Sequence, residues 1–117
     1  MEQIMKDAKK IILDAIQESL PDEAVRKGIC NREFHFEGKV IVIAIGKAAW
    51  NMAKAAAESI PHKIDTGIVL TKYAHSHGEI PGFTILEAGH PLPDENTING
   101  TKKIIDAVSG LSEKDQV

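Results

Sequence analysis

Residues 39–45, KVIVIAI, constrain the fold more than any other stretch of this sequence. The run is continuously apolar and rich in β-branched residues, so it predicts a strand covered on both faces, as in parallel sheets flanked by helices. It leads through Gly46 and Lys47 into a segment of helix-forming residues that we expect to run from Lys47 to about Ile60, before Pro61. A strand followed directly by a helix predicts an α/β fold.

Two helices are expected before this strand. Apolar residues recur at helical spacing over residues 4–16, which predicts an amphipathic helix. In the following SLPDEAVRKG, Ser19 and Asp22 have the spacing of a capping box, Pro21 suits a first turn, and Gly28 is placed to end a short second helix. Residues 1–30 are therefore expected to form a helical lead-in.

The rest of the chain alternates in the same way. TGIVLT and FTILEA predict two further strands, and Asp94 predicts the N-cap of a helix that stops near Gly110. Residues 111–117, LSEKDQV, are typical of a helix-to-strand connection followed by the first residue of another strand. We expect residues 1–117 to form one α/β domain with a mostly parallel sheet, incomplete at the C-terminus, whose strand-helix-strand core spans 39–117.

Composition excludes several classes of function. Charged residues make up 26% of the 117 residues, the net charge is −3, and lysine and arginine are scattered, so we expect neither nucleic-acid nor membrane binding. Cys30 is the single cysteine, which excludes an intrachain disulfide. The charged start MEQIMKDAKK lacks a signal-peptide core, and no apolar run could span a bilayer, so we expect a cytoplasmic protein.

The Gly46-Lys47 junction is the first candidate site. Ligands of open α/β sheets bind at the carboxyl ends of the strands, where a lysine beside a helix N-terminus favours phosphate or carboxylate. Ile41 and Ala48 stand where a Walker loop needs glycine and Ser or Thr, and the single glycine is no dinucleotide fingerprint. A solvated Lys47 remains an equal alternative, although the helix dipole makes lysine mildly unfavourable there.

More polar residues are expected at the same sheet edge. Lys72, Tyr73, His75 and His77 follow the second strand, and Gly89 and His90 join them if the third strand is parallel. The link over residues 72–82 is short for a parallel crossover, so the direction of the third strand stays open.

Each of these side chains also has a structural explanation that involves no ligand. A metal cluster of His75, His77 and His90 is disfavoured, because two of them lie in a glycine-containing loop without cysteine, and we expect no metal site. His90, between Gly89 and Pro91, is as compatible with closing a turn as with contacting a ligand. The remaining residues are expected to be structural: Trp50 and Met52 in the core or in contacts between elements, Asp94 and Glu95 at the helix start, and Glu87 without a catalytic partner.

Three motifs together resemble a known family. VIVIAIGKAAWNMAKAA, TGIVLTKYAH and EAGHPLPDENTINGTKKI have the order and spacing found in the amino-terminal domain of MOFRL-type glycerate 2-kinases, many of which are named hydroxypyruvate reductases. The resemblance covers nearly the whole chain and implies a Rossmann-like, three-layer domain. It implies ATP-dependent phosphoryl transfer to D-glycerate with Mg²⁺, with Lys47 as the catalytic lysine. From their positions at the strand ends we expect Gly46, Lys72 and His90 to contact substrate or phosphate.

The family pattern continues with a strand and a loop rich in glycine and serine that this sequence does not contain. We therefore expect a fragment that is inactive as a kinase by itself and that can self-associate through an unfinished sheet edge. The alternative is a non-catalytic module that binds an anion or a partner. A reductase is disfavoured, because residues 43–50 lack the glycines of a dinucleotide site.

Overall fold

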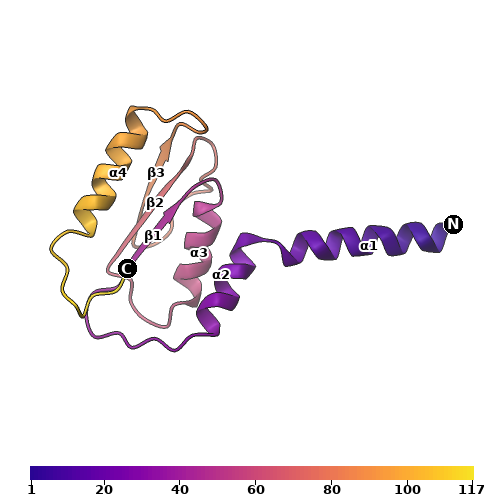
Figure 1. Ribbon diagram of the computed structural model, residues 1–117, viewed down its shortest axis with the longest axis horizontal. Coiled ribbons are helices and arrows are strands. Elements are labelled where there is room, and N and C mark those ends of the chain that lie inside the picture. Colours follow the sequence, from indigo (N-terminus) through magenta and orange to yellow (C-terminus); the bar gives the residue numbers. More distant parts are fainter.

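The computed structural model describes all 117 residues and confirms the α/β fold (Figure 1). A three-stranded sheet is flanked by helices, and a long N-terminal helix extends away from it. In chain order the elements are α1 (Glu2–Glu18), α2 (Pro21–Cys30), β1 (Ile41–Ile45), α3 (Ala49–Ser59), β2 (Thr66–Lys72), β3 (Phe83–Ala88) and α4 (Glu95–Ala107).

All three strands are parallel, in the order β1-β2-β3. Ile68 of β2 is paired with Ile43 of β1 on one side and with Thr84 of β3 on the other. The direction of β3, which the sequence leaves open, is therefore parallel, although the link from β2 to β3 contains no helix. Ile80 within this link is buried in the core, so the crossover is held to the sheet by its own apolar side chain.

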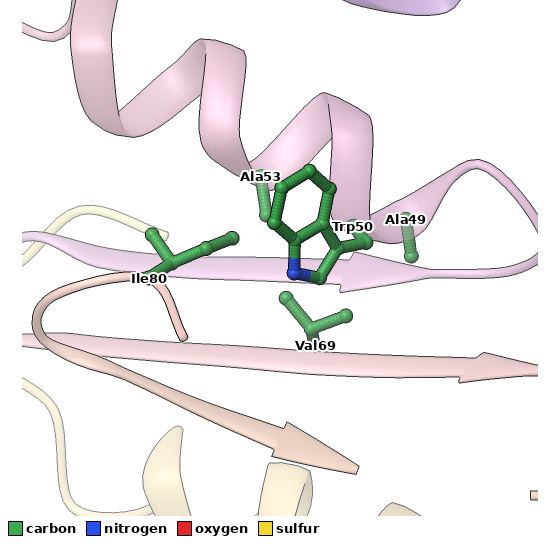
Figure 2. Close-up of a cluster of buried hydrophobic side chains, with 5 residues drawn as sticks. All are labelled: Ala49, Trp50, Ala53, Val69 and Ile80. Carbon is green, nitrogen blue, oxygen red and sulfur yellow. The ribbon is translucent and has the colours of Figure 1, made fainter. Parts of the chain in front are cut away.

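One helix packs on each face of the central strand β2. Trp50 and Ala53 of α3 pack on Val69 of β2, together with Ile80 (Figure 2). Leu70, the next residue in β2, points to the opposite face, because successive side chains of a strand alternate. There it lies so close to Gly100 of α4 that a Cβ at Gly100 would be 2.6 Å from the Leu70 side chain. α3 and α4 therefore form layers on either side of β2 (Figure 1).

β1 is not covered on both faces, contrary to the expectation from its apolar run. Ile45 is 66% exposed, whereas Gly67 to Thr71 of β2 are all buried. The reason is that α4 packs mainly on β2 and β3, so the C-terminal end of the edge strand β1 is exposed, whereas Ile41 at its start is buried. The continuous apolar pattern therefore describes β2 better than β1.

The expected boundaries of two helices need correction. Ser19 and Asp22 form no capping box at α2, because the N-cap of α2 is Leu20 and Ser19 lies one residue before it. The Ser19 hydroxyl instead donates to the Ala15 carbonyl of α1 at 2.7 Å. Pro21 occupies the first position of α2 as predicted, but Gly28 lies inside the helix, which continues to Cys30. α3 begins at Ala49 rather than at Lys47.

The core position expected as one alternative for Trp50 and Met52 is confirmed for Trp50. Trp50 is buried and belongs to the main hydrophobic cluster, whereas Met52 is 38% exposed and lies outside that cluster. At the N-terminus, α1 is a helix as predicted, but none of its residues is buried, and it projects from the body (Figure 1). None of the helices is long and apolar enough to cross a membrane.

The C-terminal residues begin to extend the sheet, as the sequence predicts. Gln116 forms a parallel bridge with Val40; its N–H donates to the Lys39 carbonyl, and its carbonyl accepts from the Ile41 N–H, both at 2.8 Å. Beyond this bridge the outer edge of β1 has no neighbouring strand. Self-association through that edge stays a prediction.

Candidate anion-binding site

A pocket of about 180 Å³ lies where the three parallel strands end. It is formed by the β1–α3 turn, the last residues of β2, and the loop from β3 to α4. Its lining includes all four residues singled out in the sequence: Gly46, Lys47, Lys72 and His90. The other lining residues are Ile45, Leu70, Thr71, Ala88, Gly89, Pro91, Pro93 and Thr97. The structure brings the four predicted residues together, and their roles in binding stay predictions.

Gly46 begins the turn that presents Lys47. Its backbone φ angle is +115°, a conformation that residues other than glycine rarely adopt. The Gly46 N–H donates to the Leu70 carbonyl at 3.0 Å, and its carbonyl accepts from the Ala49 N–H at 3.1 Å. Lys47 is exposed and lies just before Ala48, the N-cap of α3. The lysine therefore belongs to the turn, not to the first turn of the helix.

Two neighbouring side chains hold the backbone of this turn. The Thr71 hydroxyl, on a residue only 3% exposed, donates to the Gly46 carbonyl at 2.9 Å and lies 3.5 Å from the Lys47 carbonyl. His75 Nδ1 lies 3.3 Å from the Lys47 carbonyl and donates to it in the tautomer protonated at Nδ1. Sequence reasoning missed Thr71, because its role depends on the pairing of β1 with β2.

The loop between β2 and β3 is tied to α3 through Trp50. The indole Nε1 donates to the Gly78 carbonyl at 2.9 Å, and the His77 ring meets the indole edge-on at 5.0 Å. His75 and His77 thus have hydrogen-bonding and packing partners of their own, and neither of them lines the pocket. No three His, Cys, Asp or Glu side chains are grouped closely enough to hold a metal ion.

Asp94 caps α4 as predicted, and it has a further partner that the sequence did not indicate. Its carboxylate accepts from the Thr97 N–H at 3.0 Å, while the Asp94 N–H donates to the Thr97 hydroxyl at 3.1 Å. The Tyr73 hydroxyl donates to the same carboxylate at 2.6 Å and accepts from Asn96 Nδ2 at 2.7 Å. Hydrogen bonds from the Tyr73 hydroxyl and from the Gly89 and Thr97 amides lower the pKa of Asp94 to about 2. The contact with Asp94 also raises the pKa of Tyr73.

The charge of the pocket favours an anion. Lys47, Lys72 and His90 line it, and no carboxylate does. Glu87, one residue before the end of β3, faces the Ser76 N–H at 3.5 Å instead. Phosphate and carboxylate groups match a small pocket of lysine and backbone N–H groups near a helix start. The lining supplies no carboxylate ligand for Mg²⁺.

The fold and the pocket define an open, parallel α/β domain with a pocket at the carboxyl ends of its strands, where ligands of such sheets bind. Comparison with known proteins specifies this class further. The chain belongs to the family described as "Domain of unknown function (DUF4147)", which matches residues 7–117.

Its relatives include glycerate kinases, which confirms the resemblance seen in the motifs. The chain is 46% identical over 116 residues to the D-glycerate 2-kinase of Thermotoga maritima, covering 99% of this chain and 27% of the relative. It is 36% identical to a protein of Agrobacterium vitis provisionally named hydroxypyruvate reductase, over 93% of this chain and 24% of that protein. The crystal structure of a Thermotoga maritima glycerate kinase matches with a TM-score of 0.88 at 45% identity, over 98% of this chain and 27% of that one. The chain thus spans about a quarter of the length of these relatives.

Proposed function

We propose that this chain is the amino-terminal region of a glycerate 2-kinase and supplies the anion pocket for ATP-dependent phosphoryl transfer to D-glycerate. The observation that carries the proposal is the convergence of Lys47, Lys72 and His90 on one pocket at the strand ends. It is supported by the 46% identity to a protein named D-glycerate 2-kinase. Because the chain spans about a quarter of that relative, we expect it to be inactive as a kinase alone.

Lys47 has the central role in this proposal. Phosphoryl transfer depends mainly on positioning and on neutralising charge at oxygen atoms, and a lysine ammonium supplies both. Lys47 binds the glycerate carboxylate or the oxygens of the transferred phosphoryl group and stabilises the charge of the transition state. Thr71 holds the turn that carries it. Lys72 and His90 add contacts from the neighbouring strand ends.

The pocket fits one of the two expected cofactors, ATP, but not Mg²⁺. Lys47, Lys72 and the backbone of the Gly46 turn suit the phosphates of ATP, which supplies the transferred group when bound. The residues do not fit Mg²⁺, because no carboxylate lines the pocket. No step through the metal is therefore assigned to these residues.

A chimaera tests the kinase proposal. Residues 1–117 replace the matching region of the Thermotoga maritima relative, and D-glycerate-dependent ADP formation is measured with and without Lys47→Ala. We expect an active chimaera whose kcat/KM falls about 100- to 1,000-fold on substitution, the range seen when a group that stabilises transition-state charge is removed. Lys102→Ala is the matched control, because Lys102 is an exposed lysine on α4 outside the pocket.

Either of two results would contradict the kinase proposal. One is a folded chimaera, shown by cooperative melting, that forms no ADP. The other is a Lys47→Ala chimaera with activity within a few-fold of its parent. The 117-residue chain is assayed in parallel and is expected to show no turnover.

The second candidate function is a non-catalytic anion-binding module. It is favoured by one observation, that Lys47, Lys72 and His90 line the pocket but no carboxylate that could hold Mg²⁺ does. A module predicts phosphate binding without ADP formation in the chain and in the chimaera. A reductase would need a dinucleotide site, and the β1–α3 turn with its single Gly46 does not provide the glycine pattern. NADH or NADPH oxidation by the chimaera with hydroxypyruvate would reverse that conclusion.

A further inference from the structure

The Tyr73 hydroxyl joins two of the three segments that form the pocket. Tyr73 directly follows Lys72, the last residue of β2, and Asp94 ends the loop that carries Gly89 and His90. The hydroxyl donates to Asp94 Oδ2 at 2.6 Å. The Tyr73 N–H also donates to the Ala88 carbonyl at 3.3 Å, which continues the β2–β3 pairing to the pocket rim.

Gly89 packs directly over the Asp94 carboxylate at the other end of the loop. Its backbone amide contributes to the low pKa of that carboxylate. A Cβ at Gly89 would lie 2.5 Å from the Leu92 carbonyl oxygen and 3.1 Å from Asp94 Cγ, so no larger residue fits without a shift. The loop of residues 89–94 is therefore folded tightly around one carboxylate, which holds both of its ends.

Capping of α4 explains only some of these contacts. A helix cap requires an acceptor for a first-turn N–H, and the Thr97 contacts at Asp94 Oδ1 provide it. The bond from Tyr73 and the close approach of Gly89 are additional. With three hydrogen bonds already on its two oxygens, Asp94 has little capacity left to bind a cation or to accept a proton from a substrate. The two additional contacts point to a different task.

We propose that Tyr73 and Asp94 are a positioning pair for the anion pocket. Their hydrogen bond holds the loop of residues 89–93, and with it Gly89 and His90, against the end of β2 that carries Lys72. Neither residue lines the pocket, so both act through the residues that do. This inference rests on the proposed anion-binding function of the pocket.

Two substitutions separate positioning from capping. Tyr73→Phe keeps the ring and removes the hydrogen bond, while the Asp94–Thr97 cap stays intact. Asp94→Ser keeps a good N-cap residue, since serine and aspartate cap equally well, but its side chain is too short to reach Tyr73 as well. We expect each variant to bind inorganic phosphate about three- to tenfold more weakly than the wild-type chain, as for the loss of one or two hydrogen bonds.

Tyrosinate absorbance reports the contact itself, because Tyr73 is the only tyrosine in the chain. The Asp94 carboxylate raises the Tyr73 pKa and the Asn96 amide lowers it. Asp94→Ser should therefore shift the tyrosine titration to lower pH, and Asn96→Ala should shift it to higher pH. Asn96→Ala is also the control for phosphate binding, because it removes a bond to the same hydroxyl without touching Asp94, and we expect wild-type affinity.

The titrations use the 117-residue protein with inorganic phosphate, and melting temperatures are measured for every variant. Weaker phosphate binding by folded Tyr73→Phe and Asp94→Ser, with Asn96→Ala unchanged, supports the pair. Wild-type affinity in both variants, while Lys47→Ala loses binding, overturns this inference and leaves the proposed function standing. A wild-type chain that binds no phosphate overturns both. A loss of melting temperature without a loss of affinity assigns a purely structural role and overturns the positioning role.

Discussion

Thr71→Val tests how the turn that carries Lys47 is held. Valine keeps the β-branched shape of threonine and removes only the hydroxyl, which donates to the Gly46 carbonyl at 2.9 Å from a residue that is 3% exposed. The second contact, at 3.5 Å to the Lys47 carbonyl, is too long to contribute much. The substitution therefore removes one good buried hydrogen bond.

The expected loss of stability follows from what remains after the substitution. The Gly46 carbonyl still accepts from the Ala49 N–H at 3.1 Å, so it is not left without a partner, and the full desolvation penalty does not apply. The net value of one hydrogen bond, about 1 kcal/mol, is the appropriate estimate. For a domain of this size it corresponds to a fall of roughly 3 to 6 °C in Tm. Because the turn also becomes less fixed, we expect phosphate binding to weaken about two- to fivefold.

Urea unfolding and phosphate titration measure the two effects. Thr71→Ser keeps the hydroxyl and should retain wild-type phosphate affinity. Thr84→Val is the matched isosteric control, because Thr84 is an exposed residue of β3. If Thr71→Val unfolds at the same urea concentration as the wild type and binds phosphate equally well, the Thr71 hydroxyl does not hold the turn.

Two further predictions concern acid and the glycine turn. Asp94 has a pKa of about 2 in the folded chain against about 3.9 when unfolded, so its stabilisation is complete above about pH 5 and is lost as the pH falls towards 2. In urea titrations Asp94→Asn should flatten this decline, and parallel curves for the two proteins would contradict it. Gly46→Ala should lower the free energy of unfolding by about 1 to 3 kcal/mol; its φ of +115° is the whole cause, because an added Cβ would meet no atom. Gly28→Ala inside α2 is the control and should be neutral or stabilising. Equal urea midpoints for the two variants would show that the Gly46 backbone is not strained.

Local patterns were sufficient to predict much of the fold. The apolar run before Gly46, the strand patterns of residues 66–71 and 83–88, and the Asp94 cap all depend on neighbours in the chain, and all three strands and the cap are present. The parallel direction of β3 could not be predicted, because the link after β2 crosses the sheet without a helix and is held by the burial of Ile80. The exposure of Ile45 depends on where α4 packs, which no local pattern encodes.

For the candidate site, too, the sequence predicted some residues and missed others. Residue type and position at strand ends predicted Gly46, Lys47, Lys72 and His90, because parallel strands bring their carboxyl ends to one edge. The supporting contacts were missed. Thr71 reaches Gly46 across 25 residues, and Tyr73 reaches Asp94 across 21, so both depend on strand pairing. The predicted capping box at Ser19 is wrong because α2 begins one residue later than the motif requires, with Leu20 at its N-cap.

A phosphate titration followed by backbone amide NMR tests the central claim most directly. The 117-residue chain and its Lys47→Ala variant are titrated side by side with inorganic phosphate. The account predicts saturable shifts in the wild type at Gly46, Lys47, Gly89 and His90, the residues from opposite sides of the pocket, and their loss in the variant. Absence of saturable shifts at these amides, or identical shifts in both proteins, would contradict an anion site built around Lys47.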